Sequence, residues 1–392
     1  MTTTPATALL DDEMLARFDQ RAPGYDRENR FFSEDWEELK RSGYLLCTVP
    51  ESLGGSGLPL DAYVDEVRRL AYAAPATALA TNMHCYWTGV AAELLRGGDP
   101  SCAWILEQAA EGEVFAALHG EAGNDLPLAL AVATASRVEG GWEVSGHKIF
   151  GSLSPVWTYG GFHAADNSDP DHRQLVHGFV HRQSPGVQII ETWDTLGMRA
   201  TQSQDTVLER AFVPDEHVAL VCPTGFAGVG PFQVAVFAWA LLGFSAVYLG
   251  AAKRAIDLTL EQIPKRTSIA LTASMAHHPE VQHQVAEMRI GYDAAEALLE
   301  ASARDWATGV AHPDWPVRLV ATRHFVINQA IEIVDRALDL SGGAGVFKRH
   351  RIEQLFRDTR MGRFHPGNRL FAPELIGKLC LGIDPDYAPR WG

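Results

Sequence analysis

The chain has 392 residues, of which 46% are hydrophobic and 21% charged, a composition typical of a soluble globular protein with a large buried core. Its formal net charge of −16 argues against a nucleic-acid partner, because binding to phosphates requires clustered Lys and Arg. The five cysteines are scattered, odd in number and without CxxC spacing, so we expect a reduced, cytoplasmic protein.

Residues 1–115 are expected to form a helical domain. Ser33 is a plausible N-cap, and the acidic Glu34 and Asp35 suit the first turn of the helix that follows. The glycine-rich segment 50–60, "PESLGGSGLPL", separates two helices. No Lys-Ser/Thr follows these glycines, which disfavours a phosphate-binding loop. Helical periodicity resumes in "TALATNMHCYWTGVAAELL".

Residues 116–222 change to an alternation of period two. "VATASRV" and "WEVSGHKIFGS" flank a Glu139-Gly140-Gly141 turn, which is the pattern of a β-hairpin. Three further alternating segments follow, and Pro and Gly separate them: "QLVHGFVHR", "GVQIIETW" and "DTVLERAFVP". The pattern predicts a small antiparallel β-barrel domain.

Residues 223–392 predict a four-helix bundle. The segment 234–252 has no charged residue and is long enough to span a bilayer. It is solitary, rich in Ala, Gly and Ser, and not preceded by basic residues, so we favour a buried bundle helix over a membrane span. Two long amphipathic segments, 281–307 and 316–345, supply further helices of the bundle.

The order helix, sheet, helix, together with five short motifs, resembles the acyl-CoA dehydrogenase superfamily of flavoproteins over nearly the whole chain. The motifs are "PESLGGSG" (50–57), "GHKIFGS" (146–152), "TLGMRATQSQDTVLERAFVP" (195–214), "LSGGAG" (340–345) and "FRDTRMGR" (356–363). The resemblance implies a bound flavin, FAD or FMN, between a central β-domain and the helices. It also implies a homotetramer built as a dimer of dimers.

The resemblance assigns several residues to the flavin ring. Phe150 would pack beside the ring, and the Ser152 hydroxyl would bond its N5 edge. Arg199, Thr201 and Ser203 would supply donors to flavin edges or phosphates. Asn124 lies in a loop that approaches the pyrimidine side in the superfamily. This loop looks about two residues shorter here, so a polar β-turn remains an alternative for Asn124.

Three further residues are implied at the far end of the flavin. The backbone at Gly342 and Gly343 would approach the flavin of a neighbouring subunit, because glycine has no Cβ to intervene. Arg266 would support the pyrophosphate. The superfamily usually has Gln near Asp339, and a Phe-Gly pair after the arginine. Both are missing here, so the choice between FAD and FMN stays open.

The expected catalytic base is absent from its usual position. Members of the superfamily that oxidise acyl-CoA use a glutamate shortly after the Arg-Asp motif, and Pro366 stands there. No carboxylate occurs in "VFAWALLGF", where other members carry the base. His365 and, less directly, His84 resemble the histidines of the dibenzothiophene monooxygenase branch. A core histidine bonded to a carbonyl remains an alternative for His84, and a helix-end cation for His365.

The sequence therefore predicts a two-component flavin-dependent monooxygenase that uses O2 on a small organic substrate. His365, His84 and Ser152 are its expected catalytic residues. Reduced flavin would come from a separate reductase, since no NAD(P)H-binding fingerprint is visible. Two alternatives stay open: an acyl-CoA dehydrogenase or oxidase with a displaced base, and a non-catalytic flavin-binding protein. The histidines of "HHPEVQH" lack HExxH spacing, so no metal site is expected.

Overall fold

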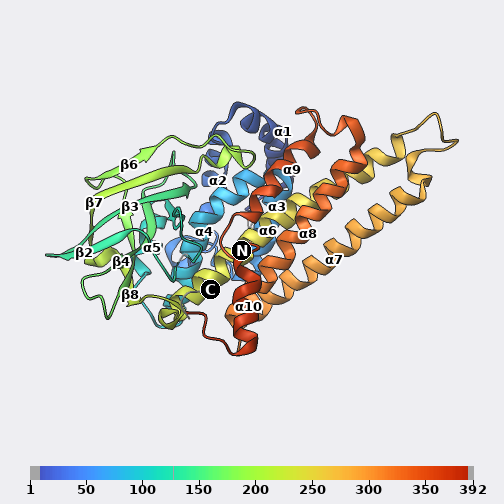
Figure 1. The fold of residues 1–392 in the computed structure, drawn as a ribbon. Helices are drawn as coiled ribbons and strands as arrows, with labels where there is room; N and C mark the ends of the chain where they lie inside the picture. The colour runs from blue at the N-terminus through green and yellow to red at the C-terminus, as the bar shows by residue number, and fades with distance from the viewer. Residues whose placement is uncertain (1–8, 127, 387–392) are drawn as a thin grey trace, which may run out of the picture.

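The computed structural model describes residues 9–126 and 128–386, in which a sheet lies at one end and the N- and C-terminal helices pack against each other beside it (Figure 1). The N-terminal helices are α1 Asp12–Glu28, α2 Ser33–Ser42, α3 Leu60–Ala73, α4 Pro75–Arg96 and α5 Ala103–Ala110. Ser33 begins α2 but does not cap it, because the buried Phe32 holds the cap position. The predicted cap was therefore wrong, while Glu34 and Asp35 do lie in the first turn.

Eight strands form one sheet in the order β6-β7-β3-β2-β4-β5-β8, with β1 paired to β4. The strands are β1 Phe115–Leu118, β2 Thr134–Val138, β3 Gly141–Gly151, β4 Tyr159–Asp166, β5 Gln174–His181, β6 Val187–Ile190, β7 Gln204–Pro214 and β8 Val218–Pro223. The hairpin predicted around Gly140 is confirmed as the antiparallel pair β2 and β3.

The prediction of an antiparallel domain was wrong at β4, whose pairs with β1 and with β2 are both parallel. A parallel pair needs a long crossover, and the β2–β3 hairpin lies within the connection from β1 to β4. In the hydrogen-bonded order, β6 and β8 stand at the two ends.

The C-terminal part consists of three long helices, α6 Pro231–Gln262, α7 Pro279–Ala307 and α8 Trp315–Ser341, and two short ones, α9 Arg351–Arg360 and α10 Phe371–Leu381. Figure 1 shows α6 running from its start beside the sheet to the far end of the bundle. The fourth place of the predicted bundle is shared by α9 and α10, which are separated by the His365-Pro366-Gly367 turn.

Helix α6 is the core helix of the molecule. Within the described residues it is the one helix apolar and long enough to cross a membrane, yet 89% of its most apolar window is buried by protein. Its glycines permit close approach: a Cβ on Gly243 would overlap the Asn82 amide, and one on Gly250 would overlap the Arg68 carbonyl. The preference for a bundle helix over a membrane span is confirmed.

The five cysteines are all free, and they differ in exposure. Cys47, Cys85, Cys102 and Cys222 are buried, whereas Cys380 is exposed on α10.

Candidate functional site

A chain of buried hydroxyl groups lies where β3 ends and β7 begins. The Ser152 Oγ lies 2.7 Å from the Ser203 Oγ, which in turn lies 2.7 Å from the Thr201 Oγ1. Thr201 donates its hydroxyl hydrogen to the Met198 carbonyl at 2.8 Å. Three residues predicted at the flavin are thereby brought together.

The Met198 carbonyl sets the direction of this chain, since a carbonyl oxygen can only accept. Thr201 has one hydroxyl hydrogen and gives it to Met198, so Ser203 must donate to Thr201. Ser152 must then donate to Ser203. The Ser152 oxygen is left with lone pairs only and acts as an acceptor for a further group.

A flavin ring needs an apolar face to pack against, and the side chain of Phe150 offers one. Its side chain is 48% exposed although the neighbouring Gly151 and the nearby Lys148 of β3 are buried, and its φ of 60° lies in the left-handed region. Such a conformation costs about 1–2 kcal/mol for a residue with a Cβ. The ring meets Trp193 edge-on at 5.9 Å. An exposed aromatic face beside a hydroxyl acceptor fits the flat, apolar ring and polar edge of a flavin.

The loop that carries the hydroxyl chain is held by α9. The Met198 amide donates to the Asp358 carboxylate at 2.6 Å, and a Cβ on Gly197 would overlap the Arg357 carbonyl. Burial raises the pKa of Asp358 to about 7. Two of the recognised motifs, 160 residues apart, therefore dock against each other.

Arg199 anchors the same loop to α1. Its guanidinium donates to the Asp26 carbonyl at 2.9 Å and to the Thr195 carbonyl at 2.8 Å, and it pairs with Asp194. These contacts assign Arg199 to holding the loop, so the structure gives no sign that it reaches a flavin phosphate. Its predicted role in binding the cofactor remains a prediction.

His365 lies between α9 and α10 and contacts α6. Its Nε2 lies 2.6 Å from the Tyr248 hydroxyl, and its ring stacks on Phe244 at 4.6 Å. Burial, and then the charge of Arg323, lowers the pKa of His365 to about 3. Arg323 itself donates to the His365 carbonyl at 3.0 Å. The lowered pKa favours a neutral imidazole over the helix-end cation, and the catalytic role of His365 remains a prediction.

A pocket of about 430 Å³ opens beside this turn, a volume suited to a small molecule. Pro366 and Gly367 line it together with Phe237 and Leu241 of α6. Two carboxylates from the C-terminal segment, Asp384 and Asp386, also line it. Asp386 accepts the amides of Phe226 and Ala227, and Asp384 accepts the amide of Asp386.

The loop between β1 and β2 forms another wall of this pocket through Leu126 and Ala129. Asn124 closes the loop on itself: its amide donates to Glu121 at 2.9 Å and to the Leu130 carbonyl at 2.7 Å. Its oxygen accepts the Leu126 amide. These bonds match the alternative of a polar turn, and flavin binding by Asn124 remains a prediction.

A buried ion pair fixes the base of that loop. Lys148 donates to Glu121 at 2.7 Å, and the same carboxylate accepts the amides of Val132 and Ala133. Burial opposes ionisation, yet the Lys148 charge lowers the pKa of Glu121. Lys148 was not predicted as a site residue, although its place at an inward position of an alternating strand was a usable signal.

His84 has both ring nitrogens bonded to backbone. Nε2 lies 2.9 Å from the Leu45 carbonyl, and Nδ1 accepts the Phe115 amide at 3.2 Å. Burial lowers the pKa of His84 to about 4. The side chain ties α4 to β1, as the alternative of a core histidine states. We therefore give it no part in the proton chemistry proposed below.

Arg266 and the glycine loop come together at the far end of the bundle. Arg266 donates to the Leu340 carbonyl, and its guanidinium would meet a Cβ placed on Gly342. Gly342 has a φ of 60°, and Gly343 has open space around its Cα. Arg266 follows the end of α6 and Gly342 the end of α8, and both helices end at the side of the bundle away from the sheet (Figure 1).

Tyr248 and Arg323 are site residues that the sequence analysis missed. Tyr248 is hidden in the apolar run of α6, where only its i+4 spacing from Phe244 could have placed it on the same face.

His278, in the histidine-rich segment, caps α7 by accepting the Glu280 amide.

Comparison with known proteins gives two family matches. Residues 7–112 match the model of the acyl-CoA dehydrogenase N-terminal domain, and residues 242–369 match that of the acyl-CoA dehydrogenase C-terminal domain.

Individual relatives fall into more than one functional group. The chain is 28% identical to a Bacillus subtilis protein named "Putative acyl-CoA dehydrogenase YdbM", over 89% of this chain and 90% of that protein. It is 29% identical to L-evernosamine nitrososynthase of a Micromonospora species, over 98% and 92%. A structure of KijD3 with FMN and dTDP-3-amino-2,3,6-trideoxy-4-keto-3-methyl-D-glucose has a TM-score of 0.81 and 26% identity, over 100% and 98%.

Proposed function

Because the chain belongs to the acyl-CoA dehydrogenase superfamily and is a flavin-dependent oxidoreductase, we propose that it is a two-component monooxygenase acting on a small organic substrate. A separate reductase would deliver reduced FMN or FAD. The observation that carries this proposal is the turn that lines the pocket with Pro366 and Gly367: it offers no carboxylate, and the preceding His365 bonds to the Tyr248 hydroxyl.

The direction of the hydroxyl chain supports the use of reduced flavin. Ser152 presents an acceptor, and the N5 of a reduced flavin carries a hydrogen, whereas the N5 of an oxidised flavin is itself an acceptor. Phe150 would hold the ring, and the buried Ser203 and Thr201 would keep Ser152 in place. Bound reduced flavin would supply two electrons to O2, so that one oxygen atom enters the substrate and the other leaves as water.

His365 and Tyr248 are suited to moving the protons that this reaction requires. A neutral imidazole can accept a proton at one nitrogen and donate from the other, and the Tyr248 hydroxyl at 2.6 Å can relay it. Burial raises the pKa of Tyr248 well above its usual value, so the phenol keeps its hydrogen.

An amine is the first substrate to test. One relative is named L-evernosamine nitrososynthase, and the KijD3 structure holds an amino-keto sugar nucleotide with FMN. Oxygenation of such an amine would convert the amine, O2 and reduced flavin into a hydroxylamine, water and oxidised flavin.

The positions of Arg266 and Gly342 support a homotetramer, in which they would reach the flavin of a neighbouring subunit. Within one protomer they follow the ends of α6 and α8, at the side of the bundle away from the sheet that carries β3 (Figure 1). Size-exclusion chromatography with light scattering should give about four times the mass of the chain. A monomer that binds flavin tightly would contradict this arrangement.

The monooxygenase is tested by mixing the full chain with photoreduced FMN or FAD and then with ¹⁸O2 and candidate amines, thioethers or aromatic substrates. We expect one labelled oxygen atom in the product by mass spectrometry. Tight flavin binding without any product, and no change in His365→Ala, would instead indicate a non-catalytic flavin-binding protein.

A second candidate, an acyl-CoA dehydrogenase or oxidase, is favoured by Asp384 and Asp386 in the pocket and by the similarity to YdbM. A carboxylate there could remove a proton from carbon beside a thioester. Anaerobic bleaching of bound flavin by an acyl-CoA, lost in Asp384→Asn, would support this candidate over the first.

A further inference from the structure

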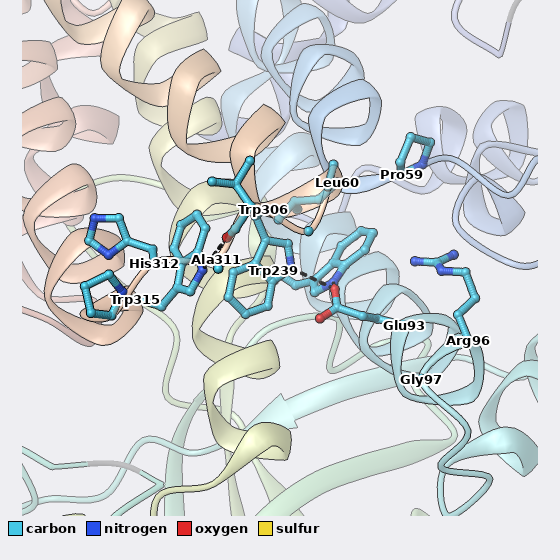
Figure 2. A pocket seen from close by; sticks show the side chains of 14 residues that line it. Pro59, Leu60, Glu93, Arg96, Gly97, Trp239, Trp306, Ala311, His312 and Trp315 are labelled. Atoms are coloured by element: carbon cyan, nitrogen blue, oxygen red, sulfur yellow. Dashed lines mark hydrogen bonds between the residues drawn. The ribbon is translucent and has the colours of Figure 1, made fainter.

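A second and larger cavity, of about 880 Å³, lies on the other side of α6 (Figure 2). We call it the tryptophan pocket, because Trp239, Trp306 and Trp315 form its walls. Phe237 and Leu241 line the pocket beside His365, and Trp239 is two residues from each. Two residues turn a helix by about 200°, so the two cavities lie on opposite faces of α6.

The tryptophan pocket contains one carboxylate in a fixed position. The Glu93 Oε2 accepts the indole hydrogens of Trp239 at 2.7 Å and Trp306 at 2.8 Å (Figure 2). Trp239 is buried, and a Cβ on Gly89 of α4 would overlap its ring. Two donors from α6 and α7 thus hold the Oε2 of Glu93. None of the described residues donates a hydrogen bond to its Oε1.

Glu93 has no cationic partner among the described residues. None of their ion pairs within 4.0 Å includes it, although Arg96 lies one turn further along α4 and also lines the pocket. Indole hydrogens orient a carboxylate but do not neutralise it. Aromatic rings attract cations through their negative faces, and the Arg318 guanidinium lies over the Trp315 ring, 5.1 Å from its centre.

We propose that the tryptophan pocket binds an organic cation, whose ammonium group pairs with Glu93 and whose apolar body contacts the indoles of Trp306 and Trp315. A fixed carboxylate beside aromatic faces is complementary to that class of ligand in both charge and polarity. The volume accommodates a body larger than the ammonium group itself. This site is independent of the flavin chemistry proposed above.

The test is a calorimetric titration of the full chain with choline chloride and with its uncharged isostere, 3,3-dimethylbutan-1-ol. We expect saturable binding of choline and at least about 10-fold weaker binding of the alcohol. Glu93→Gln keeps an oxygen for the two indoles but removes the charge, and it should weaken choline binding by about 10-fold.

Arg96→Gln is the matched control, since it removes a charge of the same pocket that has no part in pairing with the ammonium. It should leave choline binding unchanged or tighter. The thermal midpoint of each variant shows that folding is intact. Equal affinity for choline and the alcohol, unchanged affinity in Glu93→Gln, or no saturation at tens of millimolar choline would overturn the proposal.

Discussion

At the scale of single residues, the hydrogen-bond direction at Ser152 makes a prediction about flavin binding. Ser203→Ala removes the acceptor of Ser152, whose hydroxyl can then turn and donate outward. Wild-type protein should bind reduced flavin more tightly than oxidised flavin. Ser203→Ala should lower the ratio of the dissociation constants of oxidised and reduced flavin by about 5- to 10-fold, which corresponds to one hydrogen bond. Anaerobic and aerobic fluorescence titrations measure both constants.

Ser154→Ala is the control for that experiment. Ser154 is equally buried but donates to the Gly151 carbonyl and takes no part in the chain. Its ratio of the two dissociation constants should equal that of the wild type. An unchanged ratio in Ser203→Ala would show that Ser152 does not face N5.

The His365–Tyr248 pair makes a second prediction at this scale. Tyr248→Phe removes the relay hydroxyl but keeps the ring, and turnover with reduced flavin should fall by about 100-fold or more. The affinity for flavin should stay unchanged. With the pKa of His365 near 3, the pH profile of turnover should show no step near pH 6.5 from this imidazole. A step there, lost in His365→Gln, would contradict the neutral assignment.

The sequence could indicate site residues only where a motif carries them. Phe150, Ser152, Thr201 and Ser203 stand in recognised motifs, and the structure gathers the three hydroxyls. Tyr248 has no motif, because its hydroxyl finds a partner 117 residues away. Neither bond of the His84 ring could be read from sequence, since they reach Leu45 and Phe115 on other elements.

At the scale of elements, the close approach of α6 and α4 predicts a cost for any side chain at Gly243. Gly243→Ala would push the Asn82 amide away from its bond with the Tyr63 hydroxyl. We expect a loss of about 1–3 kcal/mol in the free energy of unfolding, measured by urea denaturation. Gly377→Ala on α10, where no atom lies within 4 Å, should be neutral or slightly stabilising. Equal effects of the two would refute the packing argument.

The Glu121–Lys148 pair makes a prediction about the loop that walls the pocket. Lys148→Met leaves the Glu121 carboxylate buried without its cation and should cost about 3–5 kcal/mol of unfolding free energy. The double variant that also carries Glu121→Gln should regain part of the lost free energy of unfolding. Substrate KM should rise in the double variant, since Leu126 and Ala129 line the pocket. A double variant less stable than Lys148→Met would contradict this account.

Local periodicity in the sequence predicted where the strands and helices lie better than it predicted which of them pair with each other. The hairpin of β2 and β3 is local, and its turn fixes it. The pairing of β1 with β4 depends on how β1 leaves the helices, which no local pattern records. Similarly, α9 and α10 are too short to be distinguished by periodicity from one interrupted helix, apart from the turn at Pro366 and Gly367.

At the scale of the whole molecule, buried titratable groups predict how stability depends on pH. The folded-state pKa is lowered to about 4 for His84 and to about 3 for His177 and His365, so unfolding takes up protons below pH 6.5. Burial raises the folded-state pKa of Asp35 to about 6 and that of Asp358 to about 7. Unfolding therefore releases the protons that these two carboxyl groups hold at pH 5 to 7 in the folded state. Near pH 5 the histidines take up more protons on unfolding than the aspartates release, and the net uptake is about one proton or more.

The thermal midpoint should therefore rise from pH 5 to about pH 7 and level off above it, because the protons that the histidines take up on unfolding and those that the aspartates release then nearly cancel. Differential scanning fluorimetry from pH 4.5 to 8 measures this curve. A midpoint that rises steadily as the pH falls would refute the assignment of neutral buried histidines.

The different exposures of the cysteines have a practical consequence. Since Cys380 alone of the five is exposed, a maleimide dye added to the native chain should attach at one place, without mutagenesis. That place is on α10, whose Phe371, Leu375 and Leu379 line the pocket beside Pro366. The unaltered protein thus offers a built-in attachment point for a spectroscopic reporter, one that sits on a helix in direct contact with the pocket.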